Sequence, residues 1–229
     1  MQEPSLLMVP GLGLDAEAWE PTMRELVLGG VPAASIAATT LPGYGQPLGI
    51  GDPVHPEDAA RRLIETSLPR GQRRVLVGHS SSCQVVVHAA LLAPEQVTGL
   101  FLVGPTTDPR AATWPRLALR WLATAVHEPP EQVPSLWRQY RRTGLRNMFR
   151  VMDAARRDRI QQTLARVRCQ VVVLRGPHDR IAPQDWCSSL APTVTLSRGG
   201  HMVPLTDGVL VARELRHGYG ASTRPARRG

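Results

Sequence analysis

The strongest candidate for a catalytic residue in this sequence is Ser80. It lies in Gly78-His79-Ser80-Ser81-Ser82, between the short apolar segment Arg74–Val77 and an apolar segment with helical character. A Gly-x-Ser step from a strand directly into a helix forces a tight, strained turn that raises the serine hydroxyl above the sheet. The N–H groups and dipole of the following helix would then stabilise a developing oxyanion. A serine-rich helix N-cap would explain the same residues, so the motif needs partners elsewhere in the chain.

Asp179 and His201 are the partners that a serine nucleophile requires. Asp179 follows the predicted strand Gln170–Leu174, and His201 follows the predicted strand Val194–Ser197. In open α/β sheets, loops at the carboxyl ends of the strands form the ligand site. Taken singly, Asp179 could belong to a turn and His201 to a helix cap. The order serine, aspartate, histidine at three strand ends instead favours a nucleophile, an orienting acid and a general base.

Other residues near these loops have competing interpretations. Asp108 follows another predicted strand and is the alternative acid, although an Asp-Pro turn that opens the next segment explains it better. His79 and His178 flank the nucleophile and the acid, and we interpret both as packing or loop residues. Cys83 directly follows the motif and is expected to pack as a small buried residue. These four residues therefore stay outside the predicted catalytic set.

Alternating strands and helices must position these loops. Short segments rich in β-branched residues and Leu alternate with amphipathic segments, which predicts βα units and a parallel sheet buried on both faces. The predicted strands are Ser5–Val9, Ala33–Thr39, Arg74–Val77, Thr98–Val103, Gln170–Leu174 and Val194–Ser197. The predicted helices are Glu17–Leu28, Pro56–Leu68, Ser82–Leu92, Gln184–Leu190 and Leu205–Leu215.

One segment, residues 108–166, interrupts this alternation. It has no strand pattern, contains several predicted helices separated by Pro and Gly, and is too long for an ordinary connection. It is either a cap over the site or a thickened side of the sheet. The apolar side chains of this segment that could line a pocket are Trp114, Trp121, Trp137, Met148 and Phe149, and Met202, outside the segment, is a further candidate. An equally good interpretation is that some of them only attach the cap to the sheet.

Length and composition restrict the organisation of the protein. The 229 residues, 42% of them hydrophobic, favour a single domain over residues 1–217, and the Gly-, Pro- and Arg-rich residues 218–229 are expected to be a disordered tail. The 27 basic residues, all Arg, exceed the 19 acidic ones and give a net charge of +8. These Arg are scattered and not interleaved with surface aromatics on one segment, so we do not expect a nucleic-acid partner.

The cysteines and the N-terminus indicate the compartment. The three cysteines lack CxxC spacing, so they are expected to be free thiols in a reducing compartment. The N-terminus lacks the basic region of a signal peptide, and no stretch approaches 18 apolar residues. We therefore expect a cytoplasmic protein with no membrane partner.

These features together resemble the α/β-hydrolase superfamily over nearly the whole chain. Leu7-Met8-Val9-Pro10-Gly11-Leu12-Gly13 is similar to the strand and oxyanion loop of that family, with Pro10 in place of its common His. The resemblance implies that the backbone N–H groups of Leu12 and Ser81 form an oxyanion hole. It also implies a three-layer fold with a helical cap. Its mostly or wholly parallel six-stranded sheet would lack the first two strands of the family.

The activity implied by the resemblance is that of a serine hydrolase. His201 would take the proton of Ser80 and return it to the leaving group, while Asp179 would orient the imidazole. We expect the substrate to be a small, largely apolar molecule with an ester or another activated acyl bond, and no metal or organic cofactor is implied. The same fold would also serve a lyase, a cyclase or an elimination enzyme of a biosynthetic pathway, or a binding protein without catalysis.

Overall fold

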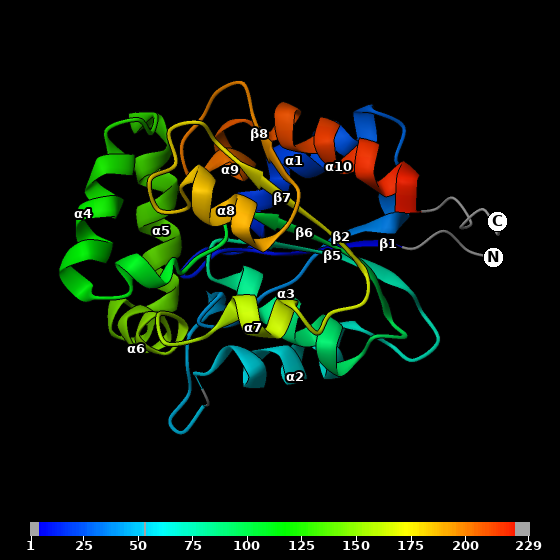
Figure 1. The fold of residues 1–229 in the computed structure, drawn as a ribbon, viewed down its shortest axis with the longest axis horizontal. Helices are drawn as coiled ribbons and strands as arrows, with labels where there is room; N and C mark the ends of the chain where they lie inside the picture. Colours follow the sequence, from blue (N-terminus) through cyan, green and yellow to red (C-terminus); the bar gives the residue numbers. More distant parts are fainter. Residues whose placement is uncertain (1–4, 53, 223–229) are drawn as a thin grey trace.

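The centre of the structure is a sheet of six parallel strands (Figure 1). The computed structural model describes residues 5–52 and 54–222. The strand order is β2-β1-β5-β6-β7-β8, and each neighbouring pair is parallel. The strands are β1 (Ser5–Val9), β2 (Ile36–Ala38), β5 (Arg74–His79), β6 (Val97–Val103), β7 (Gln170–Arg175) and β8 (Thr193–Thr195). The predicted six-stranded parallel sheet is confirmed.

The edge strands are shorter than predicted. Residues Ala33–Ser35 form a 3-10 turn after Pro32, so β2 begins only at Ile36. At the other edge, β8 ends at Thr195. A separate small sheet, β3 (Leu41–Pro42) and β4 (Gly45–Gln46), was not predicted.

Helices cover both faces of the sheet, as its apolar strands require (Figure 1). One face carries α2 (Pro56–Ser67), α3 (Ser82–Leu92) and α7 (Ile160–Leu164). The opposite face carries α1 (Glu20–Leu28) and α10 (Gly208–Ser222). The helix α8 (Gln184–Leu190) lies between β7 and β8 in the chain.

Alternate residues of β5 enter two different hydrophobic cores. Leu76 belongs to the core that includes the apolar side chains of α2 and α3. Val75 and Val77 belong to the core that includes Leu26 of α1 and Val211 of α10. Successive side chains of a strand point to opposite faces, so a strand between two helical layers is apolar at every position.

Two predicted helices are divided in the structure. The first consists of a 3-10 turn, η1 (Ala16–Trp19), followed by α1 with Pro21 in its first turn. The last consists of α9 (Val203–Thr206) and α10, separated by Asp207. The helix α10 continues through Ser222, so residues 218–222 of the expected disordered tail are helical, and residues 223–229 lie outside the described residues.

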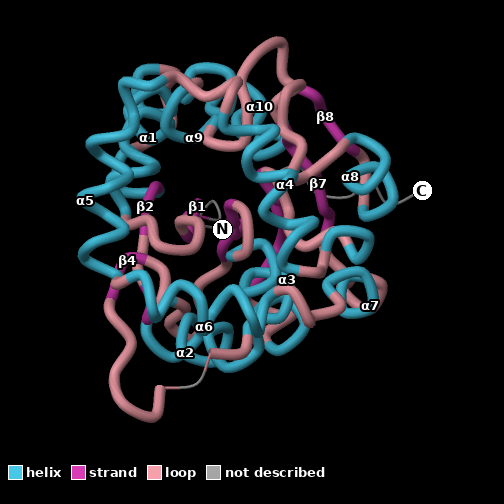
Figure 2. Tube along the Cα trace, turned by 90° about the vertical axis from the view of Figure 1, so that its left-hand side faces the viewer, coloured by secondary structure: helices cyan, strands magenta, loops and turns pink. Residues whose placement is uncertain are grey.

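The segment 108–166 is helical, as predicted. Three of its helices, α4 (Trp114–Ala125), α5 (Val133–Thr143) and α6 (Leu145–Ala155), lie beyond one end of the sheet, opposite the two termini (Figure 1). Viewed from that side, they lie on three sides of the strands, with α9 on the fourth side (Figure 2). We call α4, α5, α6 and their connections the cap. The helix α7 instead packs on α3, within the layer below the sheet.

Candidate functional site

Ser80 occupies a strained turn between β5 and α3. Its φ is +57°, and among the described residues it is the only non-glycine residue with a positive φ. Its N–H donates to Val103 O at 2.9 Å, which fixes the turn to the end of β6. Such strain in a non-glycine residue is typical of functional sites, where the surrounding structure enforces it. Ser80 therefore has the backbone expected of a nucleophile elbow.

The two serines after Ser80 have different environments. Ser82 is the first residue of α3, and its buried hydroxyl lies 2.8 Å from Val9 O and 2.9 Å from His79 O. The same hydroxyl accepts the His79 N–H at 2.8 Å, so Ser82 joins β1, β5 and α3. The Ser81 side chain is buried, whereas Ser80 is partly exposed. Only Ser80 combines the turn apex with access from outside.

Asp179 and His201 form a buried hydrogen-bonded pair. His201 Nδ1 lies 2.8 Å from Asp179 Oδ2, and both residues are buried. A carboxylate only accepts hydrogen bonds, so Nδ1 carries the proton and Nε2 of the neutral ring is free to accept one. Asp179 Oδ1 accepts the N–H groups of Ile181 and Ala182, each at 2.9 Å. The carboxylate is thus held on both oxygens.

Burial and charge oppose each other in this pair. Burial alone lowers the pKa of His201, but the adjacent Asp179 carboxylate, with a smaller effect of Glu128, raises it above its ordinary value of 6.5. Burial raises the pKa of Asp179, and the charge and hydrogen bond of His201 together with the backbone donor of Ala182 bring it below its ordinary value. The pair thus favours an ionised Asp179 and a histidine that is a strong base.

Gly104, directly after β6, brings the pair next to the elbow. It follows Val103, which accepts the N–H of Ser80. A Cβ at Gly104 would lie 3.0 Å from both Asp179 Oδ2 and His201 Nδ1. In this structure Ser80 Oγ has no hydrogen-bond partner among the described residues. The three predicted catalytic residues therefore lie together at the carboxyl ends of β5, β7 and β8, around Gly104 at the end of β6.

The loop after β1 lies against the elbow on its other side. A Cβ at Gly11 would lie 3.3 Å from Ser80 Cβ and 2.8 Å from His79 Nδ1. Within the described part of the chain, no residue accepts a hydrogen bond from the N–H of Leu12 or of Ser81, the two predicted oxyanion donors. Both groups therefore remain available for a ligand.

The backbone of His201 is held by His79 and Glu128. We interpreted His79 as a packing or loop residue, and we did not single out Glu128 from the sequence. His79 Nε2 donates to His201 O at 2.9 Å, and burial, followed by the charge of His201, lowers the pKa of His79 to about 3. His79 is therefore a neutral hydrogen-bond donor. On the opposite side, Glu128 Oε1 accepts the N–H groups of His201 and Met202 at 2.5 and 2.9 Å. No local motif of the sequence indicates either contact.

Arg175 is a further residue that sequence reasoning missed. It is buried at the end of β7, where its Nη2 donates to Asp179 O and its Nε donates to Ala182 O, both at 3.0 Å. These bonds fix the backbone of the loop that carries the acid. Its position at the end of a buried strand was the available signal, because a charged side chain there needs partners.

Asp108, the alternative acid, is engaged elsewhere. Its buried carboxylate accepts hydrogen bonds from Arg110 at 2.7 Å and from Arg120 of α4 at 2.6 Å. It also accepts the Arg110 N–H as the cap of a 3-10 turn, so the Asp-Pro turn interpretation describes it correctly. His178 stacks on His127 of the cap at 4.6 Å between ring centroids.

The predicted pocket residues fall into two groups. Met148 and Met202 lie near the loop after β1: a Cβ at Gly13 would meet Met148 Cε at 2.6 Å, and Met202 is buried with Leu14. The aromatic side chains are more exposed, at 37% for Trp114, 52% for Trp121, 55% for Trp137 and 63% for Phe149. The aromatics of the cap thus remain accessible.

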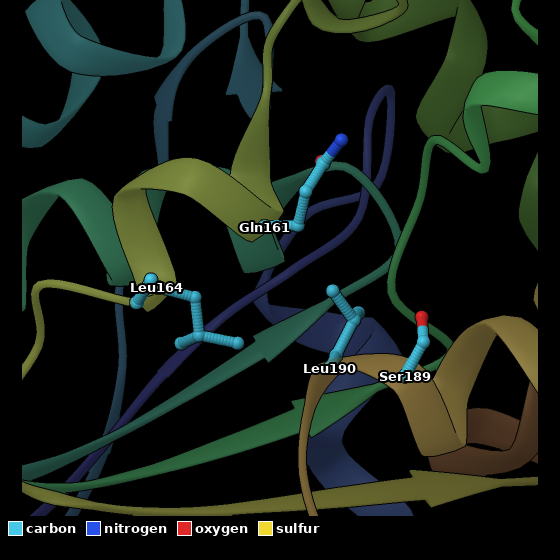
Figure 3. Close-up of a pocket in the computed structure, with 5 residues that line it drawn as sticks. Gln161, Leu164, Ser189 and Leu190 are labelled. Atoms are coloured by element: carbon cyan, nitrogen blue, oxygen red, sulfur yellow. The ribbon is translucent and has the colours of Figure 1, made fainter.

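Two hollows lie away from the predicted catalytic residues. One, of about 160 Å³, lies between α7 and α8 and is lined by Gln161, Leu164, Ala165, Ser189 and Leu190 (Figure 3). The other, of about 390 Å³, lies along α5 beside Trp137 and three arginines. Neither has Ser80, Asp179 or His201 in its lining. Within residues 5–52 and 54–222, His, Cys, Asp and Glu side chains do not form a group of three or more that could hold a metal ion. The helices of the same residues include none with the length and apolar character of a membrane span.

Comparisons with known proteins agree with this architecture. A sequence model described as "Alpha/beta hydrolase family" matches residues 6–214. No curated protein sequence matches significantly.

Solved structures give strong matches at low sequence identity. A hydrolase from Oleispira antarctica has a TM-score of 0.79 and 14% identity over 96% of this chain and 92% of that chain. A lipase-esterase related protein from Clostridium acetobutylicum has a TM-score of 0.74 and 13% identity over 94% of each chain. A thermophilic esterase from Thermogutta terrifontis has a TM-score of 0.71 and 18% identity over 96% of this chain and 91% of that chain. At these identities the similarity establishes the fold.

Proposed function

Because the chain belongs to the alpha/beta hydrolase family, we propose that it is a serine hydrolase that cleaves an ester or another activated acyl bond. The observation that carries this proposal is the left-handed backbone conformation of Ser80 together with the buried Asp179–His201 pair. Esterases and lipases among the structural neighbours support the same reaction class.

The proposed reaction begins with attack of Ser80 Oγ on the acyl carbon. His201 Nε2 takes the hydroxyl proton, and Asp179 stabilises the imidazolium and keeps the ring in the required tautomer. Negative charge on the acyl oxygen is stabilised by the N–H groups of Leu12 and Ser81, each contributing about 3 kcal/mol. His201 then protonates the leaving group, and a water molecule, deprotonated by His201, releases the acyl group from Ser80.

The proposed substrate is a small molecule with a largely apolar acyl or alcohol group. Met148 and Met202 lie near the loop after β1, and the cap presents accessible aromatic side chains. An apolar group gains free energy by leaving water for such surroundings, whereas a peptide loses hydration with few replacement partners. We therefore expect activity to rise from acetyl to medium-chain or aromatic model esters, without protease activity.

A fluorophosphonate probe tests the proposed nucleophile. The wild-type protein and Ser81→Ala should be labelled, and Ser80→Ala should not. Ser81 is the matched control because it is adjacent but has its side chain buried beneath the turn. Labelling that persists in Ser80→Ala, or a folded wild-type protein that is not labelled, would overturn the proposal.

A further inference from the structure

Glu128 connects the cap to the loop that carries His201. It lies between α4 and α5, and its Oε1 accepts two backbone N–H groups, from His201 and Met202. Its Oε2 accepts a hydrogen bond from Gln132 Nε2 at 3.0 Å. Both oxygens are thus engaged, one with the catalytic loop and one within the cap. Hydrogen bonds to an ionised acceptor are about twice as strong as neutral ones.

Gly200 makes room for this carboxylate. A Cβ at position 200 would lie 2.4 Å from Glu128 Oε1. The φ of Gly200 is not positive, whereas that of Gly199 is +101°. A methyl group at position 200 would therefore displace the Glu128 carboxylate from its present position.

His201 is consequently held at three points from three parts of the molecule. Asp179, after β7, holds ring Nδ1; His79, at the end of β5, holds the carbonyl oxygen; Glu128, in the cap, holds the N–H. The contacts of His79 and Glu128 fix the position of the His201 backbone, and the contact of Asp179 fixes the orientation of the His201 ring.

We propose that Glu128 is a positioning residue through which the cap holds the general base next to Ser80. This inference rests on the proposed function, in which His201 is that base. Displacement of a catalytic group by about 1 Å can cost about a hundredfold in rate, so an anchor on the His201 backbone has a direct kinetic effect. The cap then acts in catalysis as well as in substrate binding.

The charge of Glu128 provides a second, separable effect. The charged or titratable groups that face His201 are Asp179, Glu128 and the neutral His79. Glu128 and Asp179 both favour the protonated imidazole, so removal of either negative charge lowers the pKa of His201. Activity that needs neutral His201 would then persist to lower pH.

Three variants distinguish the effect of the Glu128 hydrogen bonds from the effect of the Glu128 charge. Glu128→Gln keeps an acceptor oxygen but removes the charge, and Glu128→Ala removes both. Glu131→Gln is the matched control, because Glu131 is an exposed cap carboxylate with no contact to His201. The His201 ring is titrated by NMR, and kcat and KM for a model ester are measured as functions of pH.

We expect Glu128→Gln to lower the NMR pKa of His201 and the acid limb of kcat/KM together, with kcat at high pH within about threefold of wild type. Glu128→Ala should lower kcat by about tenfold to a hundredfold with little change in KM. Gly200→Ala should cause a similar loss alone and little further loss in the Glu128→Ala background, because both changes remove the same contact.

The NMR titration separates this inference from the proposed function. If the wild-type protein is not labelled by the fluorophosphonate but the His201 pKa falls in Glu128→Gln, the proposed hydrolase activity is contradicted and the proposed contact of Glu128 with His201 is supported. If Glu128→Ala does not fold, as judged by circular dichroism, the pKa of Glu128→Gln decides. An unchanged His201 pKa and kcat in the Glu128 variants, equal to Glu131→Gln, would overturn the inference.

Discussion

At the scale of single residues, the side chains of the candidate site differ in exposure and in hydrogen bonding. Ser80 is strained and partly exposed, whereas Asp179 and His201 are buried and hydrogen-bonded to each other. The buried Asp179 carboxylate is tolerated because His201 and two backbone N–H groups compensate its lost hydration. This arrangement of a hydrogen-bonded pair and a free hydroxyl is the one that the proposed proton transfer at Ser80 requires.

The two candidate acids should respond differently to the same substitution. Asp179→Asn keeps the size of the side chain but favours the wrong tautomer of His201, and kcat should fall by about 10⁴-fold. Asp108→Asn should leave kcat nearly unchanged and lower the free energy of unfolding by about 1–2 kcal/mol, because it weakens screened ion pairs with Arg110 and Arg120. Ester hydrolysis and thermal unfolding of both variants check this, and the reverse pattern would assign the acid to Asp108.

At the scale of elements, the close contact of β5 with α3 creates the turn that presents Ser80. A Cβ at Gly78 would lie 2.9 Å from the backbone N and Cα of Cys83. The backbone of α3 cannot move aside as a flexible side chain would. Ser82 adds hydrogen bonds to β1 and β5 at the same junction. The N-terminus of α3 is therefore held against β5, the strand that directly precedes Ser80.

Gly78→Ala tests this junction. We expect a loss of about 1–3 kcal/mol in the free energy of unfolding, because the added methyl group overpacks the contact, and slower fluorophosphonate labelling because α3 is displaced. Gly49→Ala is the control, since Gly49 lies in an exposed loop and the three atoms nearest to a Cβ there all belong to the Asp52 side chain, at 3.1 Å or more. Denaturant unfolding and labelling rates are compared, and equal values for the two variants would contradict the prediction.

At the scale of the whole molecule, the sheet layers are well packed and the cap is more open. Trp19 is fully buried between β1 and α1, in the core that includes Leu6 and Leu26. The cap carries Trp121 and Trp137 with more than half of each side chain exposed. Exposed large aromatics on a soluble surface often mark a binding region.

Two tryptophan substitutions distinguish packing from binding. Trp19→Ala should lower the free energy of unfolding by about 3–5 kcal/mol, because it leaves a cavity in the core. Trp137→Ala should lower it by less than about 1 kcal/mol but change KM or the acyl-chain preference. Chemical unfolding and a chain-length series of esters provide the measurements. A Trp137→Ala protein that is less stable, with an unaltered chain-length profile, would make this residue structural.

The strands of the six-stranded sheet, the elbow and the order of Ser80, Asp179 and His201 could be predicted from the sequence, although both edge strands are shorter than predicted. Each of these depends on local patterns: apolar runs for buried strands, Gly-x-Ser for a tight turn, and polar residues directly after strands. The helix divisions near Pro21 and at Asp207 were missed, since apolar periodicity continues across a break in the backbone.

The side chains that bind the backbone of His201 could be identified only from the folded structure. Glu128 and His201 lie 73 positions apart in the chain, and His79 and His201 lie 122 apart. In both contacts a side chain binds a backbone group that residues of almost every type possess, so no residue type in the sequence indicates the contact. The same reason applies to Asp108 and Asp179, which have similar positions after strands and differ in the residues that folding brings to them, two arginines for one and His201 for the other.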